Sequence, residues 1–154
     1  MLNKSEVISH LVELQEEKVD SLKKSLKSSE MCAKDSPGSN KSHSDTSKFQ
    51  YSNLALGFKE KIINAEELLS NLRLLDISEK NIVCLGSLIK IKDKLTNDTF
   101  IYFIIQSGGD VLTIDNIKIT SLTLKAPFAR VFFRKKNGDE VIFRDKTYEI
   151  LNIK

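Results

Sequence analysis

The sequence predicts an α+β protein in which an N-terminal antiparallel helical hairpin, a coiled coil, is followed by a small antiparallel sheet domain with one short helix. Apolar residues recur at alternating spacings of four and three on both sides of a polar stretch, residues 28–50. This stretch is rich in serine and contains Pro37 and Gly38, which one continuous helix could not pass without breaking. After about residue 80 the spacing changes to two, the period of a strand.

The first arm of the hairpin is expected to begin at Asn3, whose side chain can accept a hydrogen bond from a free amide of the first turn, with Glu6 reaching back. We expect it to end at about Met31 or Ala33. The charged residues along it are interpreted as a solvated helix face. Its apolar seam, which only Gln15 interrupts, consists of Ile8, Val12, Val19, Leu22 and Leu26.

The second arm is expected to start near Thr46 or Ser47, with Asp45 as its N-cap, and to end near Leu75. A coiled coil between two chains is the competing arrangement, and the Pro37–Gly38 pair favours the intramolecular hairpin. The hairpin domain is therefore placed at residues 1–78 and its tip at about residues 30–48. The apolar seam of the second arm consists of Tyr51, Ala55, Phe58, Ile62, Ala65, Leu69 and Leu72.

The sheet domain is placed at residues 82–154. Residues 88–92 alternate between apolar and charged, as a half-exposed strand does, and the continuous apolar run 99–105 is typical of a central strand. Pro127 suits the first position of a short helix that runs through Phe133. Residues 137–139 predict a tight turn, and the last strands are expected at residues 140–143 and 147–153.

Composition narrows the function classes. Residues 1–80 carry 12 basic and 13 acidic residues (net −1), whereas residues 81–154 carry 12 and 8 (net +4). The basic excess of the second half favours an acidic partner surface or nucleic acid.

The two cysteines, Cys32 and Cys84, and the two histidines have no zinc-site spacing, so we expect reduced thiols. No apolar run approaches the ~20 residues of a membrane span, and the N-terminus does not resemble a signal peptide. A cytoplasmic protein without membrane association is expected.

The segment from Ala126 to Val141, with Tyr148–Ile150, resembles the C-terminal signature of the bacterial Gre transcript-cleavage factors (GreA and GreB). That signature reads Ser-Pro-Leu-Gly-Lys/Arg, a short apolar run, Gly-Lys, then Gly-Asp-Glu-Val and Tyr-Glu-Ile. The sequence departs from it at Ala126, Ala129 and Arg134, where the family usually has Ser, Gly and Gly. The matching positions are Pro127, Arg130, Lys135, Gly138, Asp139, Val141, Tyr148 and Ile150. The order of parts also agrees, with a hairpin before an FKBP-like domain.

The resemblance implies a transcription elongation factor that binds bacterial RNA polymerase at its secondary channel through the C-terminal domain. The hairpin tip would then point toward the active site and the nascent RNA 3′ end, where it would modulate elongation and the rescue of backtracked complexes. Such a factor is a monomer and not an enzyme itself. It binds no cofactor alone, but its tip carboxylates share a Mg²⁺ with the polymerase. By the same resemblance, Pro127, Phe128, Arg130 and Lys135 would contact the polymerase, while Phe132 and Phe133 are expected in the core.

The family's tip reads Asp-Leu-Ser-Glu-Asn, and its best counterpart here is Asp45-Thr46-Ser47-Lys48-Phe49. The resemblance makes Asp45 the candidate carboxylate donor and Mg²⁺ ligand, beside its alternative role as an N-cap. Lys48 replaces the second acid, and a compensating carboxylate could come from Glu30 or Asp35. The alternative function is therefore a cleavage-incompetent Gre-like regulator that occupies the channel. A coiled-coil adaptor is a further alternative; a prolyl isomerase is disfavoured because the chain has no tryptophan.

Overall fold

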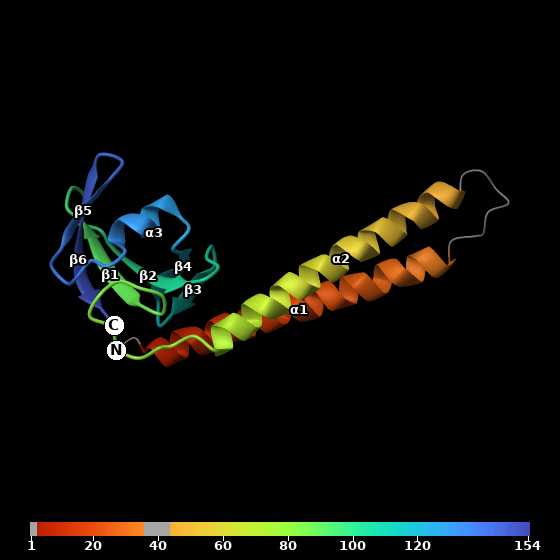
Figure 1. The fold of residues 1–154 in the computed structure, drawn as a ribbon, viewed down its shortest axis with the longest axis horizontal. Coiled ribbons are helices and arrows are strands. Elements are labelled where there is room, and N and C mark those ends of the chain that lie inside the picture. Colours follow the sequence, from red (N-terminus) through yellow and green to blue (C-terminus); the bar gives the residue numbers. More distant parts are fainter. Residues whose placement is uncertain (1–2, 36–43) are drawn as a thin grey trace. The chain divides into compact units, whose positions relative to one another are not determined.

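The computed structural model in Figure 1 describes residues 3–35 and 44–154, which form two compact units. Unit 1 consists of Met1–Leu11 with Asn71–Lys154, and unit 2 consists of Val12–Ser70. The predicted domain ranges, 1–78 and 82–154, stay a prediction, because compactness alone does not show which part of a chain folds independently. In the described residues, no helix combines the length and the apolar character of a membrane span.

Unit 2 is built from the greater part of two long helices, α1 (Lys4–Asp35) and α2 (Ser44–Arg73), that run side by side (Figure 1). They are antiparallel, since Gln15 of α1 contacts Ala65 whereas Glu30 pairs with Lys59. Both helices extend further into the polar stretch than predicted. Glu30, Met31, Ala33 and Lys34 have good helix propensity, which explains the longer α1. The predicted Pro37–Gly38 turn lies outside the described residues.

The seam between the two helices is narrow and partly polar. Its buried apolar residues are Val19, Ala55, Ile62, Ala65 and Leu69, all from the predicted seams. Tyr51 was expected in the seam but is exposed. Two polar residues, Gln15 and Ser29, are also buried, and the Gln15 Nε2 donates to the Ala65 carbonyl at 3.2 Å. Alanines at the seam allow close helix packing but bury little apolar area.

Unit 1 contains a six-stranded sheet with the order β3-β4-β2-β1-β6-β5 and a short helix, α3 (Pro127–Phe132). The strands are β1 (Leu88–Asp93), β2 (Thr99–Ile105), β3 (Val111–Ile114), β4 (Ile117–Thr123), β5 (Glu140–Phe143) and β6 (Lys146–Ile153). The α+β class and the element order are confirmed. The sheet is not wholly antiparallel, because β2 and β4 pair in parallel. The cause is the tight β3–β4 hairpin, whose turn residues Asp115 and Asn116 have positive φ and which returns β4 between β3 and β2.

The sheet has a separate apolar core on each face, because successive residues of a strand point to opposite sides. The core that includes Phe132 of α3 consists of Val83, Ile89, Ile91, Ile104, Phe132, Val141, Ile150 and Ile153. The other core includes the first turns of α1 and consists of Val7, Leu11, Leu88, Phe103, Ile105, Ile114 and Ile119. Burial on both faces accounts for the apolar residues 103–105 at the end of β2, which lies between β4 and β1 as a central strand does, whereas Phe100 near its start is exposed.

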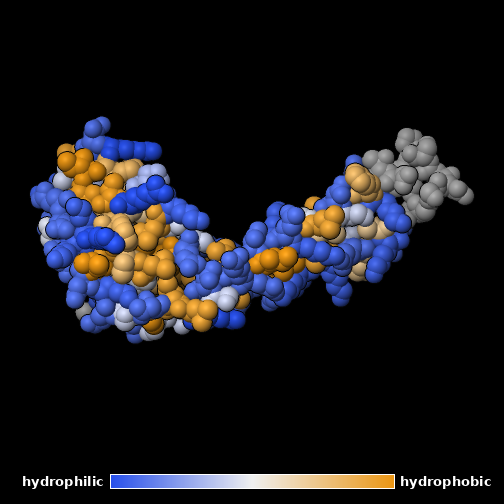
Figure 2. Space-filling view, in the orientation of Figure 1, coloured by the Kyte–Doolittle hydropathy of each residue, from blue (hydrophilic) through white to orange (hydrophobic). Residues whose placement is uncertain are grey.

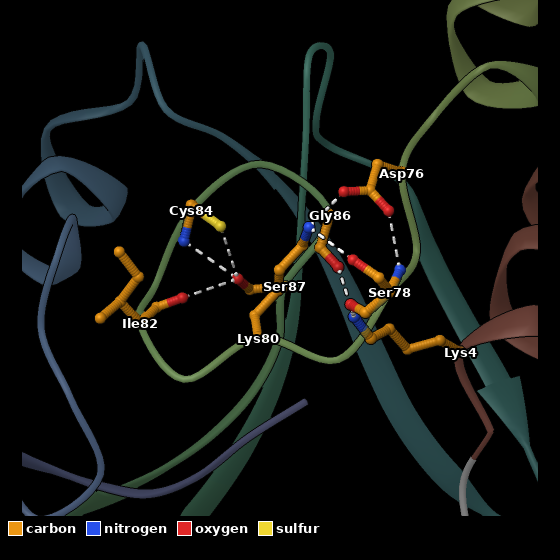
Figure 3. Close-up of polar contacts among 8 residues, drawn as sticks. All are labelled: Lys4, Asp76, Ser78, Lys80, Ile82, Cys84, Gly86 and Ser87. Carbon is orange, nitrogen blue, oxygen red and sulfur yellow. Dashed lines mark hydrogen bonds and ion pairs between the residues drawn. The ribbon is translucent and has the colours of Figure 1, made fainter.

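A polar cluster fixes the start of α1 within unit 1 (Figure 3). The buried Lys4 Nζ donates to the carbonyls of Ser78 at 2.6 Å and Gly86 at 3.0 Å. Burial lowers the pKa of Lys4, and the nearby Lys80 ammonium lowers it further. Gly86 has a φ of +83°, and a Cβ at this position would lie 2.2 Å from the Asp76 carbonyl oxygen. Only glycine fits this turn without a shift of the backbone.

Candidate functional site

The segment predicted to contact a partner forms α3 and the turn that follows it. Ala126 is extended (φ −68°, ψ 134°), and Pro127 starts the helix, where its missing N–H leaves no hydrogen bond unmade. The Arg130 N–H donates to the Ala126 carbonyl at 3.1 Å. The helix ends at Phe132, one residue before the predicted end.

Phe128 is the centre of an aromatic cluster on the α3 face of the sheet. Its half-buried ring makes edge-on contacts, with centroid distances of 5.1–5.5 Å, to the rings of Tyr102, Phe132, Phe143 and Tyr148. Burial raises the pKa of Tyr102, and the neighbouring Tyr148 contributes. Phe128 therefore holds α3 against the sheet. Its contact with a partner stays a prediction.

The other three predicted contact residues lie at the surface. Pro127, Arg130 and Lys135 are all exposed. The Arg130 Nε donates to the Leu124 carbonyl at 3.4 Å, a long contact that leaves most of the guanidinium open. The backbone of Lys135 is held by the Phe132 carbonyl and by the Val83 N–H, so the turn is tied to the core although its side chain is exposed.

Two residues of this segment were not assigned correctly from sequence. Phe132 is fully buried as expected, but Phe133 is 42% exposed, so its expected place in the core is wrong. Phe133 is the C-cap of α3, and its backbone is extended (φ −56°, ψ 131°), so its ring does not continue the helix face that Phe132 packs into the core. The Arg134 guanidinium lies over the Phe133 ring at 5.4 Å. Phe133 with Arg134 thus adds an exposed apolar and cationic pair to the predicted contact residues.

Arg134 also explains one departure from the Gre signature. Its φ is +62°, the left-handed region that glycine adopts without cost. The signature usually has glycine at this position. The backbone here keeps the conformation that glycine would favour, even though the residue is arginine.

Only part of the predicted tip site lies within the described residues. Asp45 is the second residue of α2 and not its N-cap, and its side chain lies outside the described part of the chain. Lys48 is exposed in the next turn. Glu30, a candidate for the compensating acid, pairs with the Lys59 ammonium at 3.1 Å. Among the described residues no cluster of three or more histidine, cysteine or acidic side chains could hold a metal ion. The prediction that Asp45 is a Mg²⁺ ligand stays a prediction, and Asp35 is placed only as the exposed last residue of α1.

The same region contains a groove between the two helices. It has a volume of about 680 Å³ and is lined by Glu30 and Lys34 of α1 and by Lys48 and Lys59 of α2, with Ala33 and Ala55 among its apolar residues. Sequence analysis did not predict this groove, because its lysines are up to 25 residues apart in the chain. Only the register of the helix pair brings them together.

A line of exposed apolar side chains runs along α2. Phe49, Leu56 and Ile63 follow one another at intervals of seven, and each is more than half exposed. Figure 2 shows such apolar areas on both units. The spacing places these three side chains along one side of the helix. The seam prediction did not include them.

Neither a family model nor a curated protein sequence matches the chain. Among solved structures, GreA factor homolog 1 (Gfh1) of Thermus thermophilus is 17% identical, with 97% of this chain and 93% of that chain covered and a TM-score of 0.38. Gfh1 of Thermus aquaticus is 16% identical, with 97% and 92% covered and a TM-score of 0.37. A third structure, described as the transcription factor Gfh1, is 16% identical with a TM-score of 0.37.

Proposed function

We propose that this protein is a transcription elongation regulator that binds bacterial RNA polymerase at the secondary channel and directs its helical hairpin toward the active site. The observation that carries the proposal is the order of parts. Two antiparallel helices of 32 and 30 residues are followed by a sheet domain whose α3 segment carries the Gre-like signature. A helix of 30 residues is ~45 Å long, a length suited to reaching into a channel. The protein acts as a monomer and is not itself an enzyme.

The polymerase contact is assigned to the exposed residues around α3. Pro127, Arg130 and Lys135 offer a rigid apolar group and two cations, and Phe133 with Arg134 extends that surface. Phe128 supports the contact by holding α3 on the aromatic cluster. Such a surface fits an acidic partner surface, because complementary charge speeds association and fixes orientation.

The contact is tested by Arg130→Glu, which places an acid against the acidic partner. Association with core RNA polymerase at low salt should slow about tenfold, a typical effect of reversing one rim charge. Lys118→Glu, at an exposed position of β4, is the matched control and should associate like the wild type. Equal association rates for the two variants would refute the assignment to α3.

At the tip, the alternative of a regulator that does not stimulate cleavage is favoured by a specific observation. Lys48 occupies the position of the second acid, and Glu30 is held by Lys59. At ~4 Å and an effective dielectric constant of ~20, unit charges interact by roughly 4 kcal/mol, so a lysine opposes a shared Mg²⁺ about as strongly as a glutamate would favour it. The hairpin then occupies the channel near the RNA 3′ end without supplying a carboxylate pair.

A transcript-cleavage assay on a backtracked complex separates the two forms of the proposal. We expect weak or absent stimulation by the wild type, with polymerase binding retained. Lys48→Glu should raise cleavage, and Asp45→Ala should remove any activity that exists. Strong cleavage by the wild type that persists in Asp45→Ala would contradict the assignment of Asp45.

A further inference from the structure

The groove between α1 and α2 concentrates positive charge in a unit that is otherwise slightly acidic. Between Val12 and Ser70 the sequence has nine basic and ten acidic residues, a net charge of −1. Among the described residues, the groove is lined by three lysines, Lys34, Lys48 and Lys59, and by one acid, Glu30. We call it the lysine groove. The described lining residues thus carry a charge of +2, which follows from the register of the two helices and not from the composition.

The lysine groove is also hollow enough to receive a ligand. Its volume of about 680 Å³ lies within the ~300–1,000 Å³ of small-molecule sites. Ala33 and Ala55 contribute only methyl groups to its lining, and Ser52 and Leu56 of α2 complete it. The result is a concave surface with apolar side chains and with lysines contributed by both helices.

The charges in the groove are not equivalent. Lys59 pairs with Glu30 at 3.1 Å, and both side chains are about half exposed. Lys34 and Lys48 come from opposite helices and add two further ammonium groups to the same cavity. An ammonium is a compact cation with three donors, well suited to phosphate oxygens. An anion with several charges within a few ångströms would contact both helices at once.

We propose that the lysine groove binds the polyphosphate chain of a small molecule, either inorganic pyrophosphate or a nucleoside triphosphate. A polyphosphate has enough negative charge to compete with Glu30 for Lys59. A chloride ion or an orthophosphate has less charge and should not compete. The methyl groups of Ala33 and Ala55 leave room for the nucleoside. A single-stranded RNA is disfavoured, because none of the described lining residues is aromatic and could stack a base. This inference goes beyond the proposed function and does not require polymerase.

The test measures pyrophosphate and ATP binding to the full chain by isothermal titration calorimetry, at low salt and without divalent cations. Lys48→Gln should weaken binding five- to tenfold, and Glu30→Gln should strengthen it severalfold by releasing Lys59. Binding of both probes should weaken as salt is raised, as for any charge-driven site. The two neutral substitutions thus have opposite predicted signs, which unfolding of the hairpin could not produce. Circular dichroism at 222 nm checks that both variants keep their helices.

The matched control is the Lys23–Glu66 ion pair, which joins the same two helices at 2.7 Å and does not line the groove. Lys23→Gln and Glu66→Gln make the same charge changes, and each should leave the affinity within twofold of the wild type. Equal weakening by Lys23→Gln and Lys48→Gln would overturn the site in favour of general charge attraction. The proposal is also overturned if pyrophosphate fails to bind at millimolar concentration, or if orthophosphate binds as well as pyrophosphate. A short single-stranded RNA that binds more tightly than ATP, through Lys48, would assign the groove to nucleic acid instead.

Discussion

The two units bury very different side chains. The cores of unit 1 contain fully buried Phe103 and Phe132 together with several isoleucines, whereas the seam of unit 2 buries two alanines, Gln15 and Ser29 among a few larger residues. Full burial of a large apolar side chain stabilises a fold by about 1.5–3 kcal/mol, and an alanine methyl contributes far less. Most of the tertiary stabilisation is therefore expected in unit 1.

The difference indicates what each unit is suited for. A sheet with a core on each face can hold a contact segment such as α3 in one conformation. A helix pair with a thin seam relies more on helix propensity along its length, and its facing surfaces can leave a groove. Unit 1 thus holds its contact segment rigidly, whereas unit 2 leaves a groove between its helices. The following predictions test this division, from the largest expected effect to the smallest.

Phe132→Ala should be the most damaging change, because it leaves a cavity in the α3-face core. The expected loss is about 3–5 kcal/mol of unfolding free energy. Urea denaturation followed by the tyrosine near-UV signal reports mainly on unit 1, since Tyr102 and Tyr148 lie there and Tyr51 lies in unit 2. Phe133→Ala is the neighbouring control and should cost under about 1 kcal/mol, since most surface substitutions are mild. Similar losses for both would contradict the burial of Phe132.

Lys4→Met should remove two hydrogen bonds that hold the start of α1 in unit 1. The Ser78 and Gly86 carbonyls would lose a charged donor, at an expected cost of about 2 kcal/mol. The exposed Lys24 of α1 provides the control, as Lys24→Met should have little effect. The same urea titration measures both. If the two variants were equally stable, the cluster in Figure 3 would have no energetic role.

Gln15→Leu makes the seam of unit 2 more like a core and should stabilise it by about 1 kcal/mol through added apolar burial. The Ala65 carbonyl would lose the Gln15 donor but keeps its place in the hydrogen-bond ladder of α2. The measurement is thermal denaturation at 222 nm, which the long helices dominate. A lower melting temperature would mean that the buried hydrogen bond matters more than the thin seam suggests.

The smallest expected change at neutral pH is that of Asp93→Asn in unit 1. The pKa of Asp93 is lowered because its carboxylate accepts the Leu95 N–H, and Lys146 and the Thr96 N–H add to the effect. A folded-state pKa below the unfolded value of ~3.9 gives stability that is present above that pH and is lost as the pH falls. The wild type should therefore lose stability below about pH 4.

Asp93→Asn should remove part of this acid sensitivity, because the amide oxygen can still accept the loop N–H groups but does not titrate. Urea midpoints at pH 7, 5 and 3.5, followed by the tyrosine signal, compare the two proteins. An unchanged loss of stability at low pH in the variant would mean that other carboxylates of unit 1 cause it.

Patterns local to the chain predicted the fold well, and contacts between distant residues were predicted less well. The four-three spacing identified both helices, and the period of two identified the main strands. The parallel β2–β4 pair was missed because strand alternation carries no information on direction. Phe133 was misplaced because composition alone cannot say which of two adjacent rings faces the sheet. The lysine groove was missed because it depends on which residues of α1 oppose Lys48 and Lys59.

The division of unit 1 along the chain has a consequence for the order of folding. Val7 and Leu11 belong to the same core as Phe103 and Ile119, and β6 pairs with β1 across more than 50 residues of sequence. During synthesis from the N-terminus, the first turns of α1 must wait for the sheet, and β1 must wait for residues 146–153. The α1–α2 pair has no such requirement and can form while the ribosome is still translating β2. We therefore expect two folding phases, a fast helical one and a slower one limited by the distant pairings of the sheet.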